Sequence, residues 1–467
     1  MNEKIKFGTD GWRAIIAKEY TLDNLARVAE ATALWLTKNY PEASAVVGHD
    51  CRFGGQMFAE TTAIILAKKG VKVYLAKGFV STPMISLGTF NRKASAGIVI
   101  TASHNPPSYN GFKIKAGYGG PATPAMIDEV EGLIPEVHQI PTETIAHYEA
   151  IGLIKYINLE DEYVAHVENS FDLDAIRKSG IEIAYDAMYG AGQNVMRTLF
   201  PEATFLHCDD NPGFDGQAPE PIDKNLQELS ETIKAAGDID FGLATDGDAD
   251  RIGLYNAKGK FIDSHHIILL LIHYLVKHKG MTGKVAVSFS CTDKIKELCQ
   301  QLGLEAIITK IGFKYICEFM VKDDVLVGGE ESGGIAIKGH IPERDGLWMG
   351  ITLLEYMAKT GKSLDELIEE VYNDVGAFAM ERIDHHISEA QKQTVLANCK
   401  EGNYKKFGNL TVESVEDIDG WKFHLGNGEW TMIRASGTEP VLRTYCQAAN
   451  SKRAFEILET LATEILK

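Results

Sequence analysis

The sequence lacks the features that would point to nucleic acid, to a membrane or to an oxidising compartment. Lysine and arginine number 47 against 65 aspartate and glutamate residues, and the resulting net charge of −18 repels polyanions such as nucleic acid. The 7 cysteines include no CxxC pair, which argues against both a disulfide framework and a zinc knuckle. The most apolar segment, residues 267–272, is far below the roughly 20 residues that span a bilayer. Because the first residues also contain no secretion signal, we expect a soluble protein of the reducing cytoplasm.

The length and the order of apolar segments predict several domains. A chain of 467 residues exceeds what one hydrophobic core usually serves. Residues 1–147, 148–257 and 258–375 each contain short apolar runs separated by segments with helical periodicity, so we expect three related α/β domains with mixed, mainly parallel sheets. Residues 376–467 alternate between apolar and polar positions around an Asn-Gly turn, which predicts antiparallel hairpins in a smaller α+β domain.

In each α/β domain a loop with chemically active residues follows the last strand-like run. The predicted strands are residues 45–49, 71–75, 97–100, 181–185, 204–207, 241–244, 284–288, 306–309 and 325–327, followed in the last domain by 378–382, 410–414, 421–425 and 429–434. The predicted helices include residues 22–38, 56–69 and 451–466. The loops begin near Ser103, Asp246 and Gly329. These positions lie just past the carboxyl ends of the strands, where open α/β sheets bind ligands.

A serine and a histidine share the turn in the first of these loops. Residues 101–106 read TASHNP, which places the Ser103 hydroxyl beside the His104 imidazole and suits a nucleophile. Residues 110–113 read NGFK, and we expect Lys113 to lie on a loop that brings its ammonium group near the same hydroxyl. That group would stabilise a transferring phosphoryl group or move a proton. The alternative is a turn held by local side-chain hydrogen bonds.

Three aspartates alternate in the sequence DGDADR at residues 246–251. On an extended backbone the carboxylates of Asp246, Asp248 and Asp250 point the same way and suit a hard divalent cation such as Mg2+. A solvated acidic turn is the alternative. An EF-hand is disfavoured, because that loop requires glycine at its sixth position and glutamate at its twelfth, where this chain has arginine and alanine.

The third loop reads GEESGG at residues 329–334 and combines carboxylates with a hydroxyl on a permissive backbone. Glu330 and Ser332 are therefore candidates for hydrogen bonds with sugar hydroxyls, and the alternative is a tight turn with solvated acids. Shortly after it, His340 and Arg344 add a possible ligand and a charge, although a single histidine is often structural.

A fourth polar segment, RASGT at residues 434–438, lies in the predicted C-terminal domain. A dianionic phosphate is usually held by a guanidinium, hydroxyls and backbone N–H groups. This segment offers all three: the guanidinium of Arg434, the hydroxyls of Ser436 and Thr438, and the backbone N–H groups that Gly437 allows to approach. Arg443 is a candidate second charge. The alternative interpretation is the end of a hairpin.

Together with the sequence FGTDGWR at residues 7–13, these four loops resemble in order the motifs of the α-D-phosphohexomutase family. The resemblance implies three related α/β domains and a C-terminal fourth domain around a central cleft, to which each contributes a loop. It also implies that Ser103 is a phosphoserine and that one of its oxygens holds Mg2+ together with Asp246, Asp248 and Asp250.

The resemblance further implies roles for basic and polar residues. Arg13, His104 and Lys113 match positions beside the phosphoserine, with Lys113 our first choice for acid/base catalysis, and Arg251 matches a position near the transferring group. The remaining matched residues would bind the substrate: Lys310 and Gly312 in a specificity loop, Glu330, Ser332, His340 and Arg344 at the sugar, and Arg434, Ser436, Gly437 and Thr438 with Arg443 at the phosphate that does not react.

The function that we expect from the resemblance is that of a phosphoglucomutase, an isomerase of carbohydrate metabolism. It would interconvert glucose 1-phosphate and glucose 6-phosphate through a phosphoserine enzyme, with Mg2+ as cofactor and glucose 1,6-bisphosphate as intermediate and activator. Its partners would be small hexose phosphates, and the protein would be a monomer or a homodimer.

Several alternatives stay open at this point. A phosphomannomutase or a dual-specificity phosphohexomutase shares most of the same motifs, and a phosphoglucosamine mutase agrees less well because of Trp12. A DxD-type phosphatase would use Asp246 as its nucleophile, but the usual threonine or valine is replaced there by Asp250. A noncatalytic sugar-phosphate sensor would have no need for Ser103 and Lys113.

Overall fold

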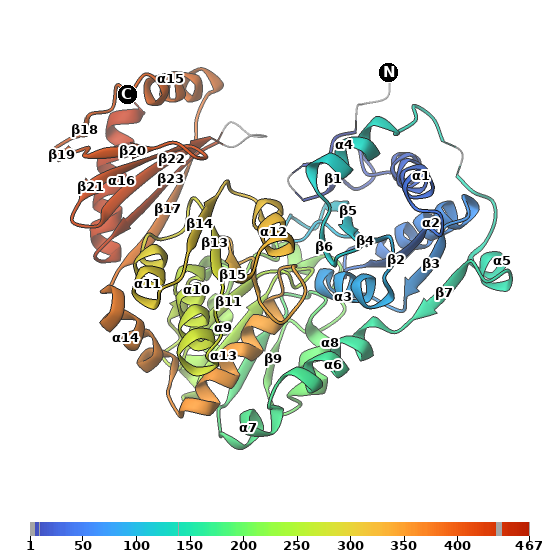
Figure 1. Ribbon diagram of the computed structural model, residues 1–467, viewed down its shortest axis with the longest axis horizontal. Coiled ribbons are helices and arrows are strands. Elements are labelled where there is room, and N and C mark those ends of the chain that lie inside the picture. Colours follow the sequence, from blue (N-terminus) through green and yellow to red (C-terminus); the bar gives the residue numbers. More distant parts are fainter. Residues whose placement is uncertain (1–4, 9, 139, 436–440, 467) are drawn as a thin grey trace. The chain divides into compact units, whose positions relative to one another are not determined.

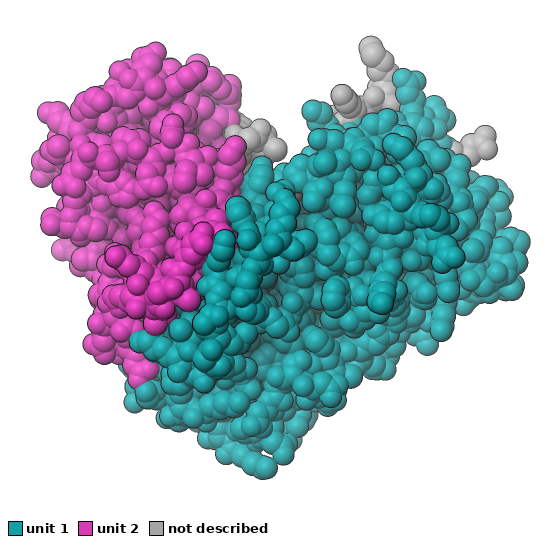
Figure 2. All heavy atoms as spheres, viewed as in Figure 1, with its two compact units in different colours: residues 1–284, 312–367 teal, residues 285–311, 368–467 magenta. Residues whose placement is uncertain are grey.

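The computed structural model describes residues 5–8, 10–138, 140–435 and 441–466, and the chain divides into two compact units (Figure 2). Unit 1 comprises Met1–Lys284 and Gly312–Leu367, and unit 2 comprises Val285–Ile311 and Ile368–Lys467. Within the described part of the chain, every helix is too short or too polar to cross a membrane.

The first sheet of unit 1 is mixed, as the sequence predicts. Its strands follow the order β1-β5-β4-β2-β3-β7, with β6 beside β5. The strands are β1 (Trp12–Ile15), β2 (Ser44–His49), β3 (Lys72–Ala76), β4 (Ala96–Ile100), β5 (Tyr109–Ala116), β6 (Gly120–Pro121) and β7 (Ile154–Ile157). The helices are α1 (Leu22–Asn39), α2 (Gly55–Lys68), α3 (Thr82–Arg92), α4 (Pro124–Gly132) and α5 (Ile145–Ala150). Strands β4, β2, β3 and β7 are parallel, whereas β5 and β1 run antiparallel to their neighbours.

Helices cover both faces of this sheet, with α1 and α2 on one face and α3 on the other (Figure 1). The alternation along β4 explains the two faces: Ile98 packs in the core beneath α1 and α2, while a side chain at Gly97 would meet Ile85 of α3. Strand β7 joins the sheet although it lies beyond residue 147, the predicted end of the first domain, because Ile154 and Ile157 are buried.

The second sheet of unit 1 repeats this layout in the order β12-β11-β10-β8-β9. The strands are β8 (Ile183–Asp186), β9 (Thr204–Leu206), β10 (Phe241–Thr245), β11 (Ile252–Asn256) and β12 (Phe261–Ile262). The helices are α6 (Leu159–Ser170), α7 (Leu173–Lys178), α8 (Gln193–Leu199) and α9 (Gln227–Ala236), with the short 3-10 helices η1 (Phe214–Gly216) and η2 (Asp223–Asn225). Strands β9, β8 and β10 are parallel, and β11 and β12 complete the sheet antiparallel.

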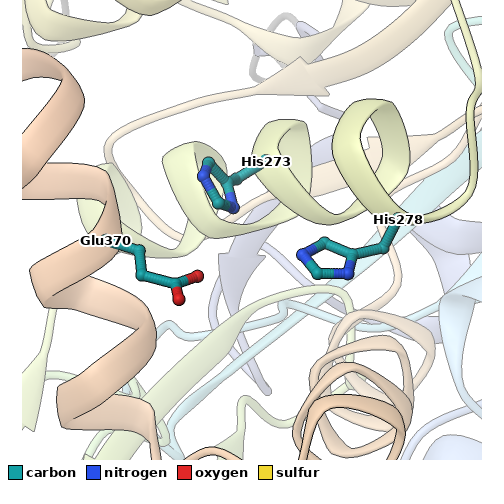
Figure 3. A group of neighbouring side chains, drawn as sticks. All are labelled: His273, His278 and Glu370. Carbon is teal, nitrogen blue, oxygen red and sulfur yellow. The ribbon is translucent and has the colours of Figure 1, made fainter.

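The last part of unit 1 contains the antiparallel pair β15 (Val325–Gly329) and β16 (Ile335–Ile337). The surrounding helices are α10 (Ser264–His273), α12 (Phe313–Lys322) and α13 (Gly346–Thr360), and α10 continues into a short π-helix, η3 (Tyr274–His278). Figure 3 shows His273 and His278 on this continuous segment. Nδ1 of His273 lies 2.7 Å from the hydroxyl of Tyr356, so this buried histidine stabilises the packing of α10 on α13.

Each of the three chemically active loops joins two antiparallel neighbours. Ser103 lies between β4 and β5, the aspartate triplet lies between β10 and β11, and Glu330 lies between β15 and β16. Gly329, which we expected to open the third loop, is the last residue of β15. The loops are therefore equivalent hairpin connections at the carboxyl ends of buried strands.

Unit 2 combines a parallel pair with an antiparallel sheet. The pair is β13 (Lys284–Ser288) with β14 (Ala306–Thr309), beside α11 (Lys294–Leu302). The sheet has the order β17-β23-β22-β21-β20. Its strands are β17 (Ala379–His386), β20 (Ser414–Glu416), β21 (Trp421–Gly426), β22 (Glu429–Ala435) and β23 (Val441–Ala448). The other elements are β18 (Lys406–Phe407), β19 (Leu410–Thr411), α14 (Leu364–Val375), α15 (Glu389–Lys400) and α16 (Ser451–Ile465), and the boundary between the units falls within α14.

Two expectations about local structure were wrong, and several strands were not predicted. Lys113 lies on strand β5 and not on a loop, because Phe112 and Ile114 face the core while Lys113 and Lys115 alternate to the other side, where both are buried among carboxylates. The predicted strand 410–414 is divided between β19 and β20. The strands that were not predicted include β1, β5, β7, β11, β16 and β23.

Candidate functional site

The Ser103 hydroxyl is buried and directed at an aspartate. The residue is 1% exposed and has a φ of 52°, a left-handed conformation that is unusual for serine. Its backbone N–H donates to Thr101 Oγ1 at 2.8 Å, and its Oγ donates to Asp246 Oδ2 at 2.6 Å. The serine loop of the first sheet thus meets the acidic loop of the second sheet.

The acidic loop is a turn rather than an extended segment. Ala249 has a φ of 55°, and its N–H donates to the carbonyl of Asp246 at 2.9 Å. The turn nevertheless brings one carboxylate oxygen from each of Asp246, Asp248 and Asp250 within 4.8 Å of the others, and all three residues are buried. The prediction that the three carboxylates converge is therefore confirmed. They converge because the backbone turns, and not because an extended chain points alternate side chains the same way.

The three carboxylates have the chemistry of a divalent cation site. The Oδ1 atoms of Asp248 and Asp250 are buried and accept no hydrogen bond among the described residues, which leaves hard oxygen ligands available. Burial and the two neighbouring carboxylates raise the pKa of Asp246 well above its usual value. A cation bound among these oxygens would offset that repulsion, so the residues fit Mg2+.

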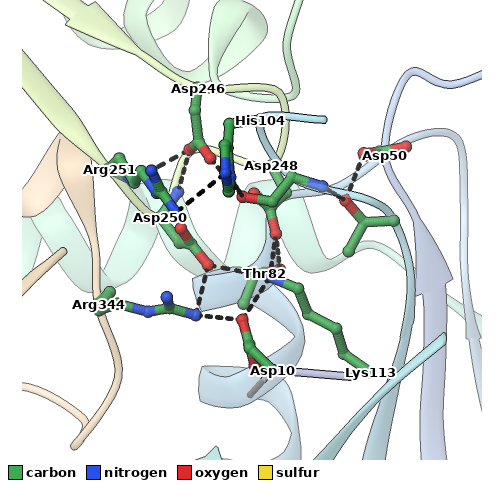
Figure 4. Close-up of polar contacts among 12 residues, drawn as sticks. Asp10, Asp50, Thr82, His104, Lys113, Asp246, Asp248, Asp250, Arg251 and Arg344 are labelled. Carbon is green, nitrogen blue, oxygen red and sulfur yellow. Dashed lines mark hydrogen bonds and ion pairs between the residues drawn. The ribbon is translucent and has the colours of Figure 1, made fainter. Parts of the chain in front are cut away.

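Lys113 and Arg344 form ion pairs with two of these carboxylates, those of Asp248 and Asp250 (Figure 4). Lys113 Nζ lies 2.8 Å from Asp248, 3.1 Å from Asp250 and 2.9 Å from Asp10. Arg344 Nη2 lies 2.7 Å from Asp250 and 2.5 Å from Asp10. Burial by itself lowers the pKa of Lys113. The carboxylates of Asp10, Asp248 and Asp250 outweigh that effect and raise the pKa above its ordinary value. Lys113 is therefore held as an ammonium ion.

Three further predicted residues lie around the hydroxyl. His104 Nδ1 is 3.4 Å from Ser103 Oγ, and His104 Nε2 is 3.5 Å from Arg251 Nη2. Arg13 Nη1 donates to Asn105 Oδ1 of the same loop at 2.7 Å. Burial and then the nearby Arg251, Arg13 and Lys113 charges lower the pKa of His104 well below its usual value, so the imidazole is neutral.

The structure also brings in residues that sequence reasoning missed. Asp10 contacts both Lys113 and Arg344, and Thr82 Oγ1 donates to Asp248 Oδ2 at 2.5 Å from the first turn of α3. Asp10 lies within the FGTDGWR segment, so that motif carried a signal. The sequence carried no signal for Thr82, because a threonine at the start of a helix is usually interpreted as part of the helix cap.

The predicted sugar-binding residues divide into two groups. Glu330 is buried, and its Oε1 accepts a hydrogen bond of 2.9 Å from the N–H of Gly312, while Ser332 in the same loop is half-buried. His340 is different, because its ring nitrogens contact Asp345 at 3.0 Å and His166 at 3.2 Å. Its fully buried ring also stacks on a tryptophan, so His340 has no nitrogen left for a sugar hydroxyl and its predicted role is not supported.

The predicted phosphate-binding residues lie in unit 2. Arg434 and Arg443 are opposite each other on β22 and β23, and two aspartates contact them: Asp419 lies 3.5 Å from Arg434 and Asp384 lies 3.6 Å from Arg443. The two guanidinium groups thus lie on neighbouring strands, and each has a carboxylate within ion-pair distance. Lys310, also in unit 2, is exposed just after β14. Ser436, Gly437 and Thr438 lie outside the described residues.

A hydroxyl beside converging carboxylates and a buried ammonium, on repeated α/β domains, is typical of phosphoryl-transfer enzymes. Models of the phosphoglucomutase/phosphomannomutase family match the chain over most of its length: alpha/beta/alpha domain I at residues 4–140, domain II at 161–259, domain III at 263–375 and the C-terminal domain at 390–464. The chain therefore belongs to the phosphoglucomutase/phosphomannomutase family of phosphohexomutases. The predicted family, the four-domain fold class and the isomerase-type phosphotransferase activity are confirmed.

Relatives of nearly equal length carry different sugar names. A phosphoglucomutase/phosphomannomutase of Thermococcus kodakarensis is 29% identical, with 97% of this chain and 96% of the relative covered. A phosphoglucosamine mutase of Clostridium novyi is 31% identical, with 98% of each covered. A crystal structure from Thermus thermophilus described as a phosphomannomutase has a TM-score of 0.88 and 32% identity over 100% of both chains. The family is thus shown, and the sugar is not decided by these names.

The buried carboxyl of Glu330 predicts a pH dependence of stability. Burial raises its pKa from 4.5 to about 7, against the opposing charge of Arg344. The folded state thus binds a proton that the unfolded state has lost, and the free energy of unfolding falls as the pH rises from about 4.5 to about 7. Between pH 5 and pH 8 this titration should lower the free energy of unfolding of the wild type by roughly 2–3 kcal/mol. We expect Glu330→Gln to lack this decrease, because glutamine does not titrate.

Calorimetric unfolding of the metal-free protein at pH 5, 6, 7 and 8 measures this difference. The exposed Glu182→Gln serves as the matched control and should follow the wild type. Equal pH dependence in Glu330→Gln and the wild type would show that Glu330 titrates near its ordinary pKa.

Proposed function

We propose that this phosphohexomutase is a phosphoglucomutase that interconverts glucose 1-phosphate and glucose 6-phosphate through a phosphoserine at Ser103 and a glucose 1,6-bisphosphate intermediate. The observation that carries the proposal is the 2.6 Å hydrogen bond from Ser103 Oγ to Asp246 at the edge of the three-aspartate cluster. It joins a nucleophile to the group that would hold Mg2+. The buried ammonium nearby favours transfer of a phosphoryl group, because it can offset the charge of the phosphoryl oxygens.

The reaction consists of two transfers in opposite directions. In the first, the P–O bond at phosphoserine 103 breaks and Ser103 Oγ takes up a proton, while a P–O bond forms to the free sugar hydroxyl, whose proton passes to a base. The bisphosphate then turns around, the P–O bond to its other phosphoryl group breaks, and that group moves back to Ser103 Oγ, while the serine proton passes through a base to the freed sugar oxygen. The net result is isomerisation without a second reagent. When bound, Mg2+ supplies positive charge that offsets the phosphoryl oxygens and the aspartates.

The basic residues around Ser103 are proposed to stabilise this charge as well. Lys113, Arg13 and Arg251 lie where they can neutralise phosphoryl oxygens, and His104 presents a neutral imidazole beside the nucleophile. The raised pKa of Lys113 keeps Nζ protonated at neutral pH, so in this arrangement Lys113 fits a fixed ammonium better than a base. Its predicted acid/base role stays a prediction.

The substrate needs a second point of attachment while it turns. We propose that Glu330, Ser332 and Gly312, with Lys310, bind the sugar. We propose that the phosphate that does not react is bound by Arg434, Arg443 and residues 436–438. The facing arginines of β22 and β23 support this role, since a dianionic phosphate would relieve their repulsion.

Glucose is our first choice of sugar because the motifs around Glu330 and Arg344 resemble the glucose-type enzymes. The second candidate is glucosamine 1-phosphate, which the name of the 31% identical relative favours, and a mannose or dual preference is the third. A cytoplasmic location is proposed on the seven buried free thiols, which suit a reducing compartment.

The nucleophile is tested by Ser103→Ala. We expect the glucose 1-phosphate mutase rate, measured in a coupled assay, to fall at least about 10³-fold, because alanine lacks the hydroxyl that would carry the phosphoryl group and that donates to Asp246. Calorimetric unfolding should stay close to the wild type. Ser108→Ala, at an exposed position of the same loop, is the control and should retain full activity. An active Ser103→Ala enzyme, or a phosphoenzyme with the acid lability of an acyl phosphate, would move the nucleophile to an aspartate.

The cation site is tested by chelation. We expect turnover to stop after dialysis against EDTA and to return with Mg2+, because the unpartnered oxygens of Asp248 and Asp250 then regain their charge partner. In Asp248→Asn, Mg2+ affinity measured by titration calorimetry should fall at least about tenfold. The exposed Asp238→Asn is the control. Wild-type turnover that persists after chelation would contradict a metal-dependent transfer.

The sugar preference is tested by comparing kcat/KM for the 1-phosphates of glucose, mannose, glucosamine and ribose, each primed with the corresponding bisphosphate. We expect glucose 1-phosphate to be preferred by at least about tenfold over ribose 1-phosphate, because the five-membered ring of the pentose places its acceptor hydroxymethyl group at a different position relative to the 1-phosphate than the six-membered ring of a hexose does. A higher value for glucosamine 1-phosphate would replace glucose by the second candidate.

A further inference from the structure

Arg52 makes an unusual set of contacts behind the nucleophile. It lies between β2 and α2, at the carboxyl end of a central strand, and its side chain is 0% exposed. Its two terminal nitrogens donate to four backbone carbonyls of the Ser103 loop. These bonds run from Nη2 to Ser103 at 2.5 Å and Asn105 at 2.6 Å, and from Nη1 to Pro106 at 2.9 Å and Tyr109 at 3.0 Å.

The neighbouring Asp50 holds the same loop by a second route. Thr101 Oγ1 donates a hydrogen bond of 2.5 Å to Asp50 Oδ2 (Figure 4). The same Thr101 oxygen accepts a hydrogen bond of 2.8 Å from the N–H of Ser103. Arg52 Nε lies 3.3 Å from Asp50 Oδ2, so the two side chains form a buried ion pair. The N–H of Ser103 is therefore held through Thr101, and its carbonyl is held directly by Arg52.

This clamp acts on the residue whose backbone is strained. Ser103 has a φ of 52°, a conformation that non-glycine residues keep only where their surroundings impose it. Hydrogen bonds on both sides of its Cα impose that conformation here. A planar guanidinium can reach four carbonyls at once because its donors are spread over a rigid fork, which a lysine ammonium cannot reproduce.

We propose that Arg52, with Asp50 and Thr101, is a positioning unit that fixes the backbone of Ser103 so that its oxygen points at the aspartate cluster. The inference rests on the proposed function of Ser103. Arg52 is not a catalytic residue, because its terminal nitrogens are occupied by the loop and its side chain is shielded from solvent, with the Phe214 ring 5.0 Å away. It acts on the reaction through Ser103 alone.

The test compares Arg52→Lys with Arg27→Lys. Arg27 is a matched control because it is also buried and donates to a backbone carbonyl, that of Pro135 at 2.6 Å, far from the site. We expect kcat with glucose 1-phosphate and glucose 1,6-bisphosphate to fall about 10- to 100-fold in Arg52→Lys, with KM within about threefold of the wild type. Arg27→Lys should keep the wild-type kcat even if its Tm falls.

Hydrogen–deuterium exchange of the peptide 101–110 provides a readout that does not require turnover. Exchange should increase in Arg52→Lys and stay unchanged in Arg27→Lys. An Arg52→Lys protein with wild-type kcat and wild-type exchange in this peptide would overturn the inference. If the wild type neither turns over nor takes up phosphate from labelled bisphosphate, the proposed function fails, while the exchange experiment still decides whether Arg52 holds the loop.

Thr101 offers a second pair of variants in case Arg52→Lys does not fold. Thr101→Val is nearly isosteric but removes the hydroxyl that links Asp50 to Ser103, so kcat should fall about 3- to 10-fold with KM unchanged. Thr101→Ser restores the hydroxyl and should recover the rate. Equal kcat for the valine and serine variants, with unchanged exchange in peptide 101–110, would also overturn the inference.

Discussion

Three buried carboxylates that converge within 4.8 Å impose the electrostatic constraint on which the site depends. Charges of one sign at that separation are stable in a protein interior only when cations or shared protons offset them. The chain supplies Lys113 and Arg344 on one side and leaves unpartnered oxygens of Asp248 and Asp250 on the other. The fold therefore neutralises the cluster only in part, and the unpartnered oxygens fit a divalent cation such as a phosphoryl-transfer site uses.

The repeated hairpin connection explains how distant segments can serve one site. In the first two sheets a buried parallel strand ends in a short loop and returns antiparallel, so the loop is held at both ends by backbone hydrogen bonds. The loop with Ser103 and the loop with Asp246 then contact each other. Rigid supports of this kind place a hydroxyl and a carboxylate within hydrogen-bonding distance without relying on flexible side chains.

The sequence predicted most elements because their apolar periodicity is local. Strands such as β13 and β14 and helices such as α1 were expected within a residue of their observed bounds. Strand β5 was missed because Lys113 and Lys115 interrupt its apolar pattern, and their burial becomes favourable only beside carboxylates from other segments. His340 looked like a ligand because sequence alone does not show that Asp345, His166 and Trp348 surround its ring.

Residue order by itself determined the chemical groups, the family resemblance and the repeated α/β pattern, since motifs and periodicity depend on near neighbours along the chain. Tertiary structure alone decided which charges meet, why the acidic loop converges although it is not extended, and how Arg52 and Asp50 hold the backbone of Ser103. The physical reason is that hydrogen bonds and ion pairs between residues more than 50 positions apart depend on the packing of whole elements. No local pattern contains that information.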